Sequence, residues 1–246
     1  MPEYNKVTVT LNEKLNSTIW KMVIEGDSSY SVNPGQFYML KCWDMEPVLW
    51  RPISVSEVDE NRITFLYAVA GRGTEKLGAL KEGQQLQIMG PLGNGFNVDA
   101  LKGKIALVCG GIGIAPMVEL SKRISAMEVD VYAGFRNEVF GVDEIKNHVS
   151  KIYISTEDGS VGNKGYVTDG FSAEGYDFVL CCGPEVMMEK VVKHCRDKGV
   201  KVYVSMEKHM ACGVGACLVC TCKTKEGNKR TCKEGPVFDG DDLVLD

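Results

Sequence analysis

The 246-residue chain lacks any apolar run as long as the roughly 18 residues of a membrane-spanning helix. Its first residues, MPEYNKVTVT, lack the basic and then apolar order of an export signal. Positive charge is not in surplus either, because 28 lysines and arginines face 33 aspartates and glutamates, for a net charge of −5. We therefore expect a cytoplasmic protein that binds neither a membrane nor nucleic acid.

Cysteine, in contrast, is abundant, with ten residues in the chain. A disulfide framework is a poor interpretation, because such frameworks belong to secreted proteins and no export signal is expected here. Four cysteines stand among apolar residues and are expected in the core: Cys42, Cys109, Cys181 and Cys195. Five crowd together near the C-terminus, which indicates a metal site: Cys212, Cys217, Cys220, Cys222 and Cys232.

The composition, 44% hydrophobic and 25% charged, is that of a globular protein, and the chain divides into three segments. Residues 1–100 contain short runs rich in β-branched and aromatic residues, separated by turn formers such as Asn33-Pro34-Gly35. This pattern predicts an antiparallel β-barrel. Its strands are expected at Val7–Leu11, Ile19–Ile24, Phe37–Lys41, Ile53–Val58, Ile63–Tyr67 and Leu86–Met89.

Residues 101–204 alternate strands with helices, which predicts an α/β domain built on a parallel sheet. Strands are expected at Ile105–Cys109, Val129–Ala133, Ile152–Ser155, Phe178–Cys182 and Val200–Val204, with one helix carrying Met117, Leu120, Ile124 and Met127 and another at Pro184–Lys198. Residues 205–246 have too little apolar content for a core of their own, so metal is expected to stabilise them. The whole chain is thus expected to be a multidomain α+β protein.

The gaps between Cys212, Cys217, Cys220 and Cys232 are four, two and eleven residues. A C-x4-C-x2-C run with a distant fourth cysteine is the plant-type [2Fe–2S] spacing, and thiolates are the soft anionic ligands that iron needs there. Two alternatives remain: a zinc site, which usually shows two separated CxxC pairs, and ordinary buried thiols. Cys222 would face away from Cys220 in an extended segment, so it is not expected to be a ligand.

A glycine-rich turn, Gly110 to Pro116, follows the first strand of the α/β segment. Such a turn lets backbone N–H groups and a helix N-terminus meet a phosphate. Gly111 and Gly113 fit the dinucleotide fingerprint G-x-G-x-x-G, but Pro116 stands at its third glycine, so a simple tight turn is the alternative. Cys182-Gly183-Pro184 lies at the carboxyl end of another strand, where open parallel sheets bind ligands.

In the barrel segment, Arg51-Pro52-Ile53-Ser54 places a guanidinium fork, suited to a pyrophosphate, near a hydroxyl, with an exposed strand start as the alternative. Together with Leu66-Tyr67-Ala68, Gly73-Thr74, Gly90 to Phe96 and the two motifs above, it resembles the ferredoxin–NADP reductase superfamily. The run from Met210 to Cys217, followed by Cys232 and Gly235 to Phe238, is similar to the electron-transfer subunits of type B dihydroorotate dehydrogenases. This similarity covers essentially the whole chain.

The resemblance implies an FAD-binding barrel over residues 1–100, an NAD-binding domain over 101–204 and a [2Fe–2S] segment over 205–246. FAD would be bound by Arg51, Pro52, Ile53, Ser54, Leu66, Tyr67, Ala68, Gly73 and Thr74. NADH would meet Gly111 and Gly113 with its phosphates and Cys182 with its nicotinamide, and Cys212, Cys217, Cys220 and Cys232 would hold the cluster. Members often carry arginine at the position of Ala68, where it would offer a positive charge to the FAD phosphates. In this chain the nearby Arg72 could supply that charge instead.

The resemblance also implies the activity. NADH gives up two electrons as hydride, an iron–sulfur cluster accepts them singly, and a flavin does both. No acid–base residue is expected, because direct hydride transfer requires none. The expected partner is an FMN-containing dihydroorotate dehydrogenase catalytic subunit of pyrimidine (UMP) biosynthesis, docked at the cluster segment in a heterotetramer with two of each chain. The alternatives are a subunit of an NAD(P)H-dependent ferredoxin oxidoreductase or of a sulfide dehydrogenase, and a zinc-stabilised binding module; NADH is not distinguished from NADPH.

Overall fold

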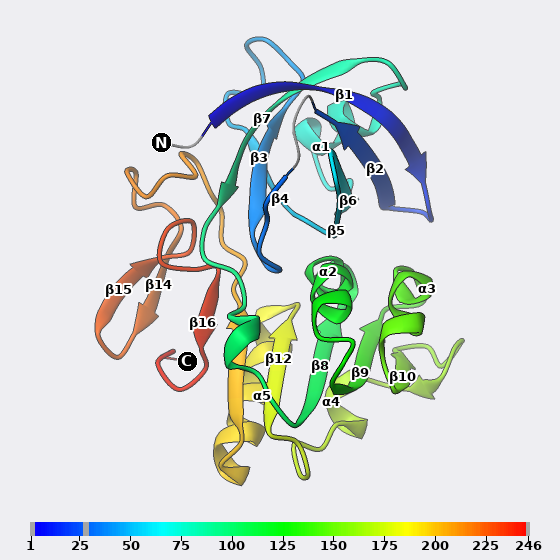
Figure 1. The fold of residues 1–246 in the computed structure, drawn as a ribbon, viewed down its shortest axis with the longest axis vertical. Coiled ribbons are helices and arrows are strands. Elements are labelled where there is room, and N and C mark those ends of the chain that lie inside the picture. Colours follow the sequence, from blue (N-terminus) through cyan, green and yellow to red (C-terminus); the bar gives the residue numbers. More distant parts are fainter. Residues whose placement is uncertain (1–2, 27–29, 245–246) are drawn as a thin grey trace.

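The computed structural model describes residues 3–26 and 30–244. Two seven-stranded sheets, one antiparallel and one largely parallel, contain most of the chain. Figure 1 shows the antiparallel sheet above the parallel one, with the C-terminal segment running along one side of both. In the part of the chain that the structure describes, no helix combines the length and the apolar composition needed to cross a membrane.

The antiparallel sheet has the strand order β4-β3-β7-β1-β2-β6-β5. Its strands are β1 (Glu3–Lys14), β2 (Ile19–Glu25), β3 (Phe37–Lys41), β4 (Arg51–Ser54), β5 (Glu57–Asp59), β6 (Arg62–Ala68) and β7 (Gln85–Leu92). Side chains that alternate along β1 and β2, such as Val9, Met22 and Ile24, are fully buried inside the curved sheet. A short helix, α1 (Arg72–Gly78), and a 3-10 turn, η1 (Val98–Ala100), follow β6 and β7; neither was predicted.

The single strand expected at Ile53–Val58 was wrong, because this stretch forms two strands that belong to opposite edges of the sheet. The N–H of Val55 donates to the carbonyl of Gln36 beside β3, at 3.0 Å, while the N–H of Ser56 donates to the carbonyl of Thr64 in β6, at 2.9 Å. The backbone thus changes partner between consecutive residues and joins both edges, which closes the sheet into the predicted barrel.

The second sheet has the order β11-β10-β9-β8-β12-β13-β16. Its first six strands along the chain are β8 (Lys104–Gly110), β9 (Glu128–Phe135), β10 (Lys151–Thr156), β11 (Asn163–Lys164), β12 (Phe178–Cys182) and β13 (Lys201–Ser205). Ile105 to Cys109 are almost completely buried, as the apolar run predicted. After β8 the chain adds β9, β10 and β11 on one side of β8, and it then returns to add β12 and β13 on the other side. Open parallel sheets have a crevice at such a point, at the carboxyl ends of the two strands that meet there, here β8 and β12.

Helices cover both faces of this sheet. The turn η2 (Gly111–Ile114) leads into α2 (Ala115–Arg123), which packs on one face near α3 (Val142–Ile145) and η3 (Lys146–His148). The opposite face is covered by α4 (Val167–Gly170) and α5 (Glu185–Lys198). Pro184 stands at the N-cap of α5, and Gly199 ends the helix at a φ of +68°, a conformation that glycine adopts without strain.

The cysteine segment packs into both halves of the molecule. Its elements are the hairpin β14 (Thr221–Thr224) and β15 (Gly227–Arg230), and β16 (Val237–Asp239), which pairs antiparallel with β13. Cys222 and Phe238 join the core between the parallel sheet and α5. Cys220 and Cys232 instead pack against a cluster from β3 and β7, namely Phe37, Met39, Met89 and Leu92. Cys220 and Cys222 thus lie in different apolar clusters, as expected from alternation along an extended chain.

Helix α2 is fastened to the barrel by a buried carboxylate. Glu119 is 3% exposed, and its oxygens accept hydrogen bonds from Val58 N–H of β5, at 3.2 Å, and from Arg123 Nε, at 2.7 Å. Lys122 and Glu57 form an ion pair across the same boundary. Because the glycine-rich turn leads directly into α2, these contacts also fix that turn relative to the barrel.

We expect Glu119→Ala to lower the free energy of unfolding by about 2 kcal/mol, because it removes the acceptor of the partly buried Val58 N–H and of Arg123 Nε at the boundary between α2 and the barrel. Urea denaturation followed by circular dichroism measures this change. The matched control is Asp143→Asn, which removes an exposed carboxylate paired with Lys146 and should leave stability unchanged. Equal stability of the two variants would contradict the assigned role of Glu119.

Candidate functional site

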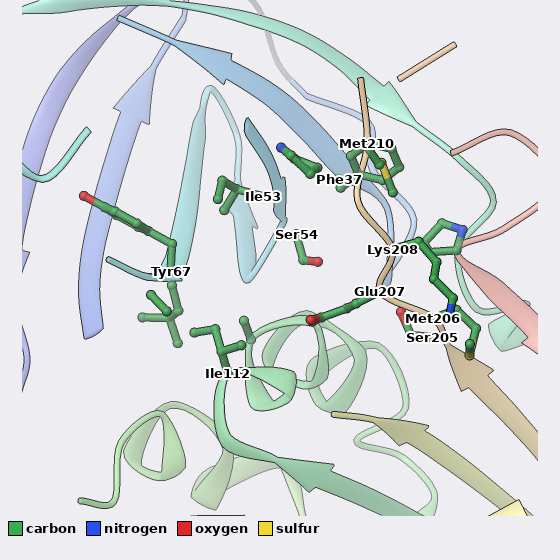
Figure 2. A pocket seen from close by; sticks show the side chains of 15 residues that line it. Phe37, Ile53, Ser54, Tyr67, Ile112, Ser205, Met206, Glu207, Lys208 and Met210 are labelled. Atoms are coloured by element: carbon green, nitrogen blue, oxygen red, sulfur yellow. The ribbon is translucent and has the colours of Figure 1, made fainter. Parts of the chain in front are cut away.

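A cavity lies where the barrel meets the parallel sheet and the start of the cysteine segment. Six of the residues predicted to bind FAD line it: Pro52, Ile53, Ser54, Leu66, Tyr67 and Ala68. They come from β4 and β6, which the closed barrel brings near each other at its lower rim. Figure 2 shows Ser54 and Ile53 on one side of the cavity and Ile112 of the glycine-rich turn on the opposite side.

The remaining predicted FAD residues also lie together. The guanidinium of Arg51 lies so close to Gly73 that a Cβ on Gly73 would be 2.4 Å from Arg51 Nε. Thr74 Oγ1 accepts the N–H of Ala70 at 3.0 Å and shapes the turn before α1. Arg72, the suggested substitute for an arginine at position 68, forms an exposed ion pair with Glu46. The structure therefore brings Arg51, Gly73 and Thr74 together, while Arg72 has another partner.

Several lining residues were not predicted from the sequence. Phe37 comes from β3, Ile112 and Ala115 come from the glycine-rich turn and α2, and the rest come from the end of β13 and the segment after it: Ser205, Met206, Glu207, Lys208, Met210 and Pro236. The sequence did contain one indication of the residues from the C-terminal segment, namely their position directly after the last parallel strand. Ser205 ends the last parallel strand and residues 206–210 follow it directly, and the carboxyl ends of parallel strands form the edge where ligands bind.

A second cavity lies at the carboxyl ends of the central parallel strands. It is lined by Gly110, Gly111, Gly134, Phe135, Arg136, Glu157, Tyr166, Pro184, Met187 and Lys190, among others. Gly111 lines this cavity, with a φ of +53° that favours glycine, and its contact with the phosphates of NADH stays a prediction. Gly113 instead makes a close packing contact, because a Cβ there would lie 2.3 Å from the carbonyl oxygen of Cys182. Cys182 itself is 1% exposed.

The glycine-rich turn is a thin wall between the two cavities. Gly110 and Gly111 line the cavity of the parallel sheet, and Ile112 and Ala115 line the one beneath the barrel. A ligand in one cavity is therefore separated from a ligand in the other by a single turn of backbone. This arrangement suits a reaction in which a group passes directly from one ligand to the other.

The four predicted ligand cysteines are arranged as two pairs. Cys217 N–H points to Cys212 Sγ at 3.4 Å, and the two thiols are within hydrogen-bond range. Cys232 N–H points to Cys220 Sγ, also at 3.4 Å, and these thiols are likewise neighbours. Cys220 and Cys232 are buried, Cys212 is half-buried and Cys217 is exposed. One pair therefore faces the interior and the other faces the surface.

Backbone N–H groups in this loop point to cysteine sulfur atoms and stabilise their negatively charged form. Burial raises the pKa of Cys212, but N–H donors of Cys217, Val214 and Ala216 more than offset it and bring the pKa to about 6. Burial, and then the neighbouring Cys220, raise the pKa of Cys232 to about 12, although Gly215 N–H points to its sulfur at 3.2 Å.

In residues 3–26 and 30–244, no three His, Cys, Asp or Glu side chains surround a single metal-ion position. The cysteines instead form two adjacent pairs, and such pairs suit a cluster in which each of two metals takes two protein thiolates. A structural zinc ion would need four ligands around one point. The donor set, four cysteines in two neighbouring pairs, fits a two-iron cluster.

Two side chains connect the cavity beneath the barrel with the cysteines. Phe37 and Met210 both line that cavity, and both pack in the apolar cluster that contains Cys220 and Cys232. Figure 2 shows Phe37 and Met210 next to each other at the edge of the cavity. One layer of side chains therefore separates the predicted flavin site from the interior cysteine pair.

Comparison with known proteins identifies the family of the chain and the nature of its cysteine segment. Residues 207–244 match the family model of the iron–sulfur cluster binding domain of dihydroorotate dehydrogenase B. The chain is 57% identical over 243 residues to the dihydroorotate dehydrogenase B (NAD⁺) electron transfer subunit of Clostridium acetobutylicum, covering 99% of this chain and 98% of the relative. It is 51% identical to the subunit of the same name from Clostridium perfringens, covering 97% of each.

Solved structures share the fold. A structure reported for an NADH-dependent reduced ferredoxin–NADP oxidoreductase matches with a TM-score of 0.87 at 27% identity, covering 97% of this chain and 90% of that one. The ferredoxin reductase of carbazole 1,9a-dioxygenase matches with a TM-score of 0.71 at 19% identity, covering 81% and 67%, and supports the fold alone. The expected fold class and family are thus confirmed. The chain belongs to the family of dihydroorotate dehydrogenase B (NAD⁺) electron transfer subunits.

Proposed function

We propose that this chain carries electrons between NAD(H) and a dihydroorotate dehydrogenase catalytic subunit in pyrimidine biosynthesis, through FAD and a [2Fe–2S] cluster. The observation that carries the proposal is the order of the sites. The two cavities share the glycine-rich turn as a wall, and the cavity beneath the barrel shares Phe37 and Met210 with the interior cysteine pair. When bound, FAD supplies the exchange between the hydride of NADH and the single electrons of the cluster.

For FAD, the barrel residues provide two kinds of contact. Arg51 offers a planar fork of donors for the pyrophosphate, and the missing side chain of Gly73 leaves the space that its guanidinium occupies. Ser54, Leu66 and Tyr67 line the cavity that would hold the isoalloxazine ring, with the Ser54 hydroxyl directed to its interior. Phe37 and Ile112 bring apolar surface to the same cavity. These residues bind and orient the ring and keep it between the other two sites.

For NAD(H), the second cavity provides the crevice at the carboxyl ends of β8 and β9. Gly110 and Gly111 present backbone close to where the phosphates would lie, and Arg136 and Lys190 contribute positive charge to the lining. The relatives are named for NAD⁺, and we assign NAD(H) to this cavity. Gly113 would act indirectly, by allowing the turn to pack against the Cys182 carbonyl.

We assign the cluster to Cys212, Cys217, Cys220 and Cys232, and the docking surface of the catalytic subunit to the loop around the outer pair. Val214, Leu218 and Val219 are 40%, 63% and 55% exposed there, although their side chains are apolar. A partner that covers them would receive electrons at the outer cysteine pair. The partner proposed is an FMN-containing catalytic subunit, in an assembly with two of each chain.

The first test is the colour and content of protein purified without oxygen. We expect flavin absorption with an iron–sulfur shoulder, about two irons and two sulfides per chain, and bleaching on addition of NADH. Cys232→Ser should lose the cluster, whereas the matched control Cys222→Ser should retain it, because Cys222 packs in the separate core beneath α5. Zinc in place of iron, or no bleaching by NADH, would contradict the proposal.

The second test concerns Gly73. We expect Gly73→Ala to weaken FAD binding at least tenfold, about 1.4 kcal/mol, because the new methyl group must displace the Arg51 guanidinium. Fluorescence titration of the flavin-free protein with FAD measures the affinity. The control is Gly71→Ala, in the same turn, where a Cβ meets nothing within 4 Å and the extended φ of 173° suits alanine. Equal FAD affinities of Gly73→Ala and Gly71→Ala would show that Arg51 does not bind FAD.

The third test concerns the partner. We expect Leu218→Asp to weaken association with the co-expressed catalytic subunit at least tenfold, because docking would bury the introduced charge. The Leu218→Asp variant should still be bleached by NADH. Val161→Asp is the control, since Val161 is also exposed but follows β10 near the opposite edge of the parallel sheet. Quantitative co-purification and light scattering measure binding, and unchanged binding of Leu218→Asp would exclude this surface.

A further inference from the structure

One charged side chain beside the cysteine loop has no part in the function described so far. Arg230 ends β15 and pairs there with Thr221 of β14, the residue that directly follows Cys220. Cys232 lies two residues further along the chain. Arg230 is thus next to both cysteines of the interior pair, and its side chain is 29% exposed.

The guanidinium of Arg230 is held in one orientation by partners on two sides. Its Nε donates to Glu234 Oε2 at 2.9 Å, and its Nη2 forms an ion pair with Glu234 Oε1. The same carboxylate accepts the backbone N–H of Arg230 at 2.7 Å. Nη1, on the other side of the planar group, donates to the carbonyl oxygen of Gly215 at 2.8 Å. The cation therefore lies between the cysteine loop and the carboxylate.

Through Gly215, this cation acts on the sulfur atoms of both pairs. The carbonyl of Gly215 and the N–H of Ala216 belong to one peptide group, and that N–H points to Cys212 Sγ at 3.3 Å. A cation bound to the carbonyl polarises the peptide group and strengthens its N–H as a donor. The N–H of Gly215 points to Cys232 Sγ at 3.2 Å. Arg230 thus fixes the backbone that donates to one sulfur of each pair.

Arg230 also acts on the interior pair directly through its charge. The guanidinium lies within electrostatic range of the sulfur atoms of Cys232 and Cys220. Both cysteines are buried, so water screens this interaction weakly. Lys233 also borders Gly215, but it is exposed and solvent screens its charge. Because an arginine does not lose its proton in proteins, the positive charge of Arg230 is fixed.

We propose that Arg230 is a positioning residue that raises the reduction potential of the [2Fe–2S] cluster. This inference rests on the proposed function. When the cluster gains one electron from the flavin, its net charge becomes one unit more negative. The fixed cation of Arg230 and the N–H groups that it holds stabilise this added charge, so the equilibrium moves toward the reduced cluster. When the electron leaves for the catalytic subunit, the added charge leaves with it, and Arg230 neither gains nor loses a proton in either step.

The test is the midpoint potential of the cluster in the complete complex, titrated without oxygen and followed by electron paramagnetic resonance. Arg230→Gln removes the cation and leaves the Glu234 carboxylate behind. We expect this variant to favour the reduced cluster at least tenfold less, a midpoint potential about 59 mV lower. Glu234→Gln keeps the cation, together with a side-chain oxygen that accepts hydrogen bonds from it. We expect this second variant to favour the reduced cluster at least threefold more, a potential about 28 mV higher.

The opposite signs separate an effect of charge from a loss of structure. If Arg230 and Glu234 only held the hairpin together, both substitutions would loosen the cysteine loop and shift the potential in the same direction. The matched control is Arg62→Gln, which breaks another arginine–glutamate pair, with Glu25, between β6 and β2 of the barrel. The cluster potential of this control should equal that of the wild type.

The outcomes also separate this inference from the function on which it rests. Equal potentials of the wild type and Arg230→Gln, or shifts of the same sign in the two variants, would overturn the role of Arg230. If Arg230→Gln retains no cluster, Glu234→Gln decides alone, and a potential that is not raised would overturn the inference. A wild-type complex without iron would instead overturn the proposed function, and this inference with it.

Discussion

The structure depends on the inability of the cysteine segment to form a core of its own. Its apolar side chains are few, so Cys222 and Phe238 pack beneath α5 while Cys220 and Cys232 pack against β3 and β7. Both contacts are needed to bury this surface, and together they fix the segment across the boundary between the two sheets. Residues 205–210, which lead into it, therefore pass through that boundary and complete the cavity beneath the barrel.

This placement explains how one modest chain can hold three sites in series. The cavity of the parallel sheet, the cavity beneath the barrel and the interior cysteine pair are separated only by a glycine-rich turn and by two side chains, Phe37 and Met210. The relative position of the first two sites is further held by Glu119, which joins α2 to β5. Distances between redox groups are thus set by rigid elements and not by flexible linkers.

Much of this organisation could be predicted from the sequence, because it follows from local patterns. Short runs of β-branched and aromatic residues between turn formers predicted the barrel, the apolar run at Ile105 predicted a strand buried on both faces, and the cysteine spacing predicted the cluster segment. What could not be predicted depends on contacts distant along the chain. The break between β4 and β5 arises because Val55 and Ser56 bond to different strands, and Glu207 enters the cavity only because the last segment crosses the domain boundary. The role assigned to each predicted site residue stays a prediction.

The pairing of β16 with β13 has a consequence for how the protein is made. β13 would be the outermost strand of the parallel sheet if β16 did not cover it, and β16 belongs to the segment that metal is expected to stabilise. An uncovered outer strand offers its backbone groups to other chains and promotes aggregation. A chain that has not acquired its cluster would therefore be more prone to aggregate than the complete protein.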